Sequence, residues 1–252
     1  MNKATDETAA HKSFVENIGR LWSLFEVMRE EFRIVIGTVN LRRERLLSKL
    51  EAARRGDILP LGEQEVAEEE NANDRSARLE AADALLSDWH VVMLVTFTEA
   101  YLEDVLAACA ARDPELMSRS EQTVGYGDVR AATSVEELLD EIRHRWARNF
   151  VDDGGPERWI ERLVRMGARG YESNDAEALE ELWGIRHVVV HAAGRATRDF
   201  VRRHPRLGFQ AGARLDVGTT LEADYYDPLF RFVDTTDFFL VRRYFSDASG
   251  TG

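Results

Sequence analysis

The sequence predicts an all-α fold, and three of its features support this prediction. Two long stretches carry apolar side chains at alternating steps of three and four residues, the spacing that places them on one face of a helix. Helix-capping residue pairs and helix-ending glycines separate several shorter apolar segments. Only residues 214–217 have the character of a strand, so we expect at most a short β-hairpin.

The first long helix is expected between residues 6 and 54, with Gly37 as a candidate kink. Its apolar seam has near-heptad spacing and consists of Phe14, Ile18, Leu21, Phe25, Met28, Phe32, Val35, Val39 and Leu46. Such a seam packs either on its own domain or against a second chain, and the pattern fits both. We therefore interpret residues 1–62 as an N-terminal helical extension that serves packing or dimerisation.

The segment after this extension is expected to be irregular. Pro60, Gly62 and a run of five glutamates predict an acidic loop over residues 63–72. The main domain is expected to follow at residues 73–246, and its first helix is the second of the two long ones. Residues 247–252 are expected to be a disordered tail.

The remaining helices are predicted from their start and stop signals. Helices are expected at residues 73–111, 134–150, 156–167 and 227–245. Ser134 and Glu137 form a capping box at the start of one of them. Asn174 and Glu177 form another, at the start of a helix that Gly194 is expected to end.

Composition and charge restrict the class of protein. The 252 residues are 44% apolar, enough for a core, and their formal net charge of −13 argues against non-specific coating of nucleic acid. No apolar run is long enough for a membrane span, and the N-terminus lacks the apolar core of a signal peptide. The single cysteine, Cys109, cannot form an internal disulfide and is expected to be a small packed side chain. We therefore expect a cytoplasmic protein without membrane association.

One segment carries three residues suited to chemistry: Glu180-Glu-Leu-Trp-Gly-Ile-Arg186-His187-Val-Val-Val-His191-Ala-Ala-Gly194. This arrangement resembles the signature of HEPN domains, in which an arginine, a polar residue directly after it and a histidine four to six residues further on lie near the end of a helix. Residues 97–106 are similar to an aromatic-acidic helix of the RiboL-PSP-HEPN branch. The resemblance covers about residues 73–245 and implies a HEPN-like helical bundle, to which the N-terminal extension is added.

The resemblance assigns catalysis to Arg186, His187 and His191, and their chemistry fits RNA cleavage. Histidine transfers protons near neutral pH, and a guanidinium holds two oxygens of the phosphate that a ribose 2′-hydroxyl attacks. No metal or other cofactor is needed. Helical geometry places His187 and His191 on one face, whereas five residues turn Arg186 away from His191 by about 140°. HEPN relatives combine their motifs by dimerisation, so Gly184 is interpreted as allowing two such helices to approach closely.

Arginine is concentrated around this motif. Residues 184–206 hold six arginines and one acid, Asp199, and guanidinium groups suit phosphate. The residues expected to guide RNA are Arg195, Arg198, Arg202, Arg203 and Arg206. A solvated basic face is the alternative interpretation. A second pair with motif-like spacing, Arg198 and His204, is set aside because His204 precedes Pro205 and is biased away from helix.

These features predict a metal-independent endoribonuclease. The resemblance implies cleavage to 2′,3′-cyclic phosphate and 5′-hydroxyl ends, in a toxin–antitoxin or antiphage defence setting. The expected partners are RNA, a second copy of the chain in a homodimer, and an antitoxin or defence protein. The alternative function is a non-catalytic HEPN module that binds a nucleotide or a partner protein. Two other interpretations of the histidines stay open, namely structural side chains with satisfied hydrogen bonds and two ligands of a zinc site.

Overall fold

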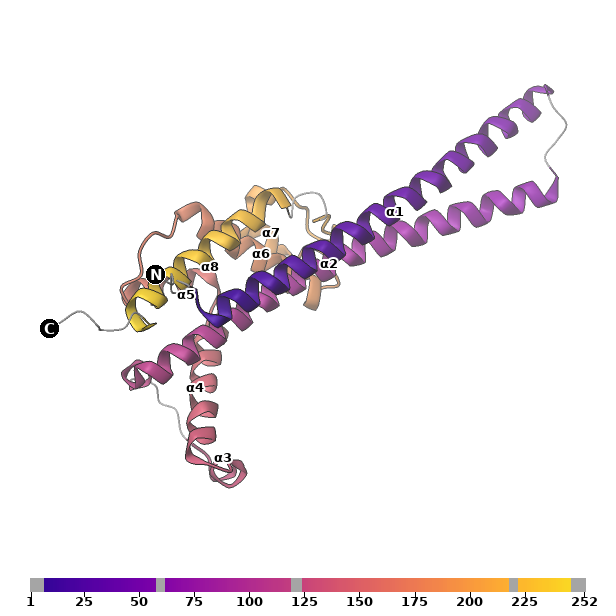
Figure 1. The fold of residues 1–252 in the computed structure, drawn as a ribbon. Coiled ribbons are helices and arrows are strands. Elements are labelled where there is room, and N and C mark those ends of the chain that lie inside the picture. The colour runs from indigo at the N-terminus through magenta and orange to yellow at the C-terminus, as the bar shows by residue number, and fades with distance from the viewer. Residues whose placement is uncertain (1–6, 58–61, 119–123, 218–221, 246–252) are drawn as a thin grey trace, which may run out of the picture. The chain divides into compact units, whose positions relative to one another are not determined.

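The protein was analysed as a computed structural model that describes residues 7–57, 62–118, 124–217 and 222–245. Within these residues the chain forms eight α-helices and no strand, so the all-α prediction is confirmed. The helices are α1 (Ala9–Arg55), α2 (Glu63–Arg112), α3 (Tyr126–Ala131), α4 (Val135–Asp152), α5 (Pro156–Arg165), α6 (Ser173–His191), α7 (Arg198–Arg203) and α8 (Asp227–Leu240) (Figure 1). No helix in the described part of the chain is long and apolar enough to cross a membrane.

The chain divides into two compact units. Residues 20–90, here called the hairpin unit, comprise most of α1 and the first half of α2. Residues 1–19 and 91–252, here called the motif-bearing unit, comprise the start of α1, the end of α2 and all later helices. The predicted catalytic residues therefore all belong to the motif-bearing unit.

Helices α1 and α2 run antiparallel in the hairpin unit. Phe25 lies against His90, with ring centroids 4.1 Å apart, whereas Val39 and Leu46 line one groove together with Asn71. The predicted seam thus faces α2, and α1 continues through Gly37 without a break. Burial of His90 disfavours its charged form and lowers its pKa to about 4.

The predicted acidic loop over residues 63–72 is wrong, because these residues form the first part of α2. Glutamate and alanine, which dominate this run, are good helix formers, and negative charge near a helix N-terminus is favourable. These local preferences explain a helix where the charge run suggested a loop. Pro60, which supported the loop, lies outside the described residues.

The core of the motif-bearing unit forms around α6, which packs against α5 and α8. The indole of Trp159 on α5 meets that of Trp183 on α6 edge-on, with centroids 5.0 Å apart. Asp175 in the first turn of α6 is buried and accepts hydrogen bonds from Arg231 of α8 at 2.7 and 3.0 Å. Side chains that complete this core include Leu163, Leu179, Leu182, Ile185, Val188, Leu229, Phe232 and Val233.

A buried carboxylate attaches the start of α1 to α8. Asp237 is 2% exposed and accepts hydrogen bonds from the backbone N–H of Thr8 at 3.1 Å and from its hydroxyl at 2.5 Å. The hydroxyl of Tyr101 on α2 lies 3.5 Å from the same carboxylate. Burial, followed by the charge of Asp237, raises the pKa of Tyr101 well above its usual value. Nearby, the His11 ring bonds to the exposed Asp234 at 2.8 Å.

Several predicted helix boundaries are confirmed, and two local features are corrected. Ser134 caps α4 by accepting the Glu137 N–H at 3.1 Å, and Pro156 begins α5. The predicted cap at Asn174 is wrong, because α6 already begins at Ser173 and Glu172 occupies the capping position. The candidate strand at residues 214–217 is reduced to one antiparallel bridge between Arg195 and Arg214.

Cys109 is fully buried, as expected, and burial raises the pKa of its thiol to about 12. The predicted tail lies outside the described residues.

Candidate active site on helix α6

The motif occupies the last two turns of α6, which ends at His191 as its sequence predicts. Gly194 adopts a left-handed φ of 71°, and its N–H returns to the carbonyl of Val188 at 3.2 Å. This geometry satisfies a terminal carbonyl and favours glycine, which has no Cβ to clash. The helix thus stops before Gly194, as predicted, and the left-handed turn that follows it begins at Ala193 with a φ of 50°.

His187 and His191 lie together on one exposed face of α6, with ring centroids 4.6 Å apart. The pKa of His187 is lowered, first by partial burial and then by His191, Arg203 and Arg186, while Asp199 acts in the opposite direction. The imidazole of His187 is therefore mainly neutral at pH 7, and a neutral imidazole can accept a proton. The structure thus brings two histidines together where solvent reaches both.

Arg186 lies on a different side of α6 from His191, and its charge acts on an acid of α2. Its side chain is half-buried, and its Nε is buried with no hydrogen-bond partner among the described residues. The nearby acid is Glu99, which accepts a hydrogen bond from the Trp183 indole at 3.2 Å. Burial raises the pKa of Glu99, and attraction to Arg186 is the main opposing effect. Arg186 is thus within electrostatic reach of Glu99.

Glu99 has no role in the predictions made from the sequence. The only signal available was its place in the aromatic-acidic segment 97–106. Its proximity to Arg186 joins residues that are far apart in the chain, and helical periodicity does not reveal such a pairing. This electrostatic attraction makes Glu99 a candidate for positioning Arg186.

Gly184 makes room for a side chain of the same chain. A Cβ built on Gly184 would lie 2.6 Å from Nε2 of His204, closer than real Cβ contacts allow. Gly184 was interpreted as allowing a second α6 helix to approach closely. This interpretation is corrected, because His204 of the same chain occupies the space next to Gly184. His204 lies outside helix, as Pro205 predicts, yet its ring rests on α6 and packs against Phe200 at 5.0 Å.

The predicted RNA-binding arginines differ in their environments. Arg195 donates to the carbonyl of Gly212 at 3.1 Å, and Arg198 is exposed at the start of α7. Arg202 and Arg203 both form ion pairs with Asp199.

Arg206 differs from the other arginines of this run because its partner is a buried acid. It donates to both oxygens of Glu181 at 3.0 and 2.6 Å, and Glu181 is only 2% exposed. A buried carboxylate needs its cation, so Arg206 serves the fold. Arg195, Arg198, Arg202 and Arg203 are exposed and not bound to a buried acid, so they are the main candidates for contact with phosphate.

The described residues contain no cluster of three or more histidine, cysteine, aspartate or glutamate side chains placed to hold a metal ion. His187 and His191 supply two imidazoles at the spacing that zinc sites use.

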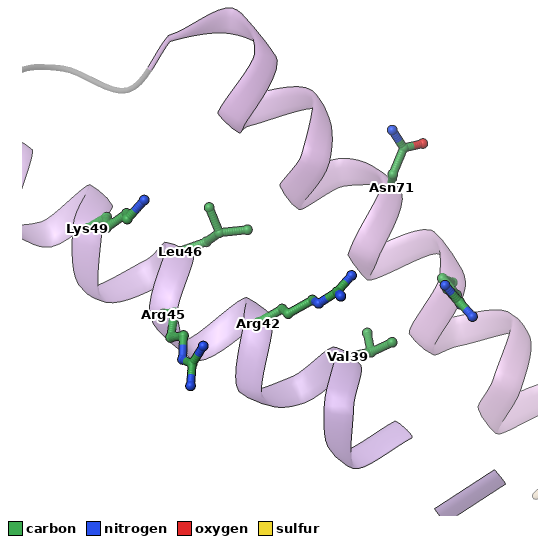
Figure 2. Close-up of a pocket in the computed structure, with 7 residues that line it drawn as sticks. Val39, Arg42, Arg45, Leu46, Lys49 and Asn71 are labelled. Atoms are coloured by element: carbon green, nitrogen blue, oxygen red, sulfur yellow. The ribbon is translucent and has the colours of Figure 1, made fainter. Parts of the chain in front are cut away.

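A second basic surface, which the sequence did not predict, lies in the hairpin unit. A groove of about 720 Å³ between α1 and α2 is lined by Val39, Arg42, Arg45, Leu46, Lys49, Asn71 and Arg75. The side chains of Arg42 and Leu46 extend from α1 toward α2 (Figure 2). Positions 42 and 49 continue the spacing of the seam and would be apolar in a strict heptad, but they hold arginine and lysine.

Comparisons with protein-family models, curated protein sequences and solved structures gave no significant match.

Proposed function

We propose that the protein is a metal-independent endoribonuclease of the HEPN type. The observation that carries this proposal is the exposed pair of His187 and His191, 4.6 Å apart at the end of α6, with Arg186 directly before the first of them. Arg203 lies near enough to lower the pKa of His187, so a second guanidinium acts on this histidine. Both imidazoles are open to solvent, as a polymeric substrate requires.

The proposed reaction is transfer of the phosphate to the neighbouring ribose oxygen. The 2′-hydroxyl loses its proton to an imidazole and attacks the adjacent phosphorus, while the bond from phosphorus to the 5′-oxygen breaks. The leaving 5′-oxygen takes up a proton, which gives a 2′,3′-cyclic phosphate and a 5′-hydroxyl. His191 is proposed as the main proton-transfer residue. His187 shares this role or orients the phosphate, and its mainly neutral state suits a proton acceptor.

Guanidinium groups supply the positive charge. The phosphorane gains negative charge during attack, and a planar guanidinium can donate to two of its oxygens. Arg186 is proposed for this role. The exposed arginines Arg195, Arg198, Arg202 and Arg203 are proposed to guide RNA to the site.

RNA cleavage by the purified protein is expected to continue in EDTA, because histidine and arginine supply the proton transfer and the positive charge. The measurement is gel analysis of a labelled single-stranded RNA, with identification of the cyclic phosphate end. Loss of cleavage in chelator that zinc or manganese restores would contradict the mechanism. Tight binding of RNA or a nucleotide without cleavage would favour a non-catalytic HEPN module.

We also propose a homodimer, and a cytoplasmic location. Arg186 and His191 lie on different sides of α6, so a cleft shared by two subunits would let the motif of one subunit complete the motif of the other. Light scattering at micromolar concentration is expected to give twice the mass of the chain, 28.7 kDa. Full activity in a monomer would exclude a shared cleft.

A toxin–antitoxin or defence setting predicts that expression of the protein slows growth and that an antitoxin or defence protein modulates this effect on growth.

A further inference from the structure

Helix α7 is held against the turn of α6 that carries His187. Phe200 of α7 is 2% exposed, and the His204 ring occupies the space above Gly184. Gly184 lies about one helical turn before His187, and Arg203 directly precedes His204. The basic end of α7 is therefore fixed near the turn of α6 that leads to His187.

Asp199 pairs with two arginines at this end of α7. Its carboxylate accepts a hydrogen bond from Arg202 at 2.5 Å and another from Arg203. The side chains of Asp199, Arg202 and Arg203 are 49%, 80% and 60% exposed, so these ion pairs contribute little to stability and open readily. Asp199 and Arg203 act on the protonation of His187 with opposite signs, which places both within electrostatic reach of that ring.

We propose that Arg202 and Arg203 form a phosphate-binding subsite beside His187, and that Asp199 is an internal counter-ion which an RNA phosphate displaces. The non-bridging oxygens of a phosphodiester accept hydrogen bonds from guanidinium groups as a carboxylate does. Asp199 therefore competes with RNA and weakens its binding. This inference rests on the proposed function only in taking RNA as the ligand.

Asp199→Asn is expected to tighten RNA binding by about threefold to tenfold, because two exposed guanidinium groups lose their competitor. Binding is measured by fluorescence anisotropy with a labelled oligouridylate, in the His191→Ala background so that cleavage does not interfere. The slope of the salt dependence is expected to steepen by about 0.7 for each additional phosphate that the freed arginines neutralise.

Asp153→Asn is a matched control. Asp153 also forms ion pairs with two arginines, Arg158 and Arg162, and removing its charge changes the net charge equally. This control is expected to leave RNA binding unchanged. Equal tightening in both variants, or unchanged affinity in Asp199→Asn, would overturn the subsite.

A second measurement reports the geometry without RNA. In an NMR titration, Asp199→Asn is expected to lower the pKa of His187 further, because the acid that raises it is removed, whereas Asp153→Asn is expected to leave it unchanged. An unchanged His187 pKa in Asp199→Asn would overturn the proposed proximity. Failure of the proposed function gives a different result. The wild-type protein then binds RNA without cleaving it, and Asp199→Asn still tightens that binding.

Discussion

Replacing His191 with alanine is expected to lower the rate of RNA cleavage at least about a hundredfold, the usual contribution of a general acid or base. His191 is exposed and is the last residue of α6, so its removal leaves no cavity in the core. Alanine is also a good helix former. The loss therefore reports chemistry rather than folding, which circular dichroism checks directly.

A panel of variants separates the roles within the motif. His144→Ala removes another exposed histidine, on α4, and is expected to cleave normally. Arg186→Lys keeps the positive charge but loses the planar guanidinium, so we expect a substantial loss of cleavage rate in this variant too. His187→Ala is expected to cause a milder loss than His191→Ala. Neither Arg198→Ala nor His204→Ala is expected to abolish cleavage. Normal cleavage by folded His191→Ala would mean that the active site lies on another helix.

Asp237→Ala is expected to lower the free energy of unfolding by about 3 kcal/mol, the largest effect on stability among the carboxylates described above. The substitution leaves the backbone N–H and the hydroxyl of Thr8 without their acceptor, and an unsatisfied group costs about 1–3 kcal/mol where it is buried. The Tyr101 hydroxyl keeps its hydrogen bond to the Val233 carbonyl. Urea unfolding measures the change. Hydrogen exchange is expected to accelerate at the start of α1, because Asp237 attaches that end to α8.

Asp234→Ala is the matched control for this effect. Asp234 lies one turn earlier on α8 and bonds to His11 at 2.8 Å, but its side chain is 63% exposed. Only the Asp234 end of this pair is exposed, whereas His11 is 8% exposed, so we expect a destabilisation that is measurable but smaller than that of Asp237→Ala. Equal losses in the two variants would show that the N-terminal attachment does not depend on the buried carboxylate.

The sequence by itself determined the features that depend on short-range geometry. The spacing of apolar residues determined the long N-terminal helix and the helix that bears the motif. Four-residue spacing placed His187 beside His191, and a glycine with a left-handed φ ended the helix at the predicted point. These features follow from the 3.6-residue repeat and from local backbone preferences, which neighbouring residues define. The acidic run at 63–72 was the exception, because charge composition alone does not distinguish a loop from a helix end.

Only the tertiary structure decided which distant groups meet. It brought Glu99 within electrostatic reach of Arg186 and placed the His204 ring over Gly184. It also paired Arg206 with the buried Glu181 and Arg202 with the exposed Asp199, although both arginines belong to the same basic run. Each of these pairings joins residues of different segments, and the spacing of residues within one helix does not predict such pairings. The partner of an ionic side chain is chosen by how the helices pack, since burial of one charge makes its pairing obligatory whereas an exposed charge can exchange partners.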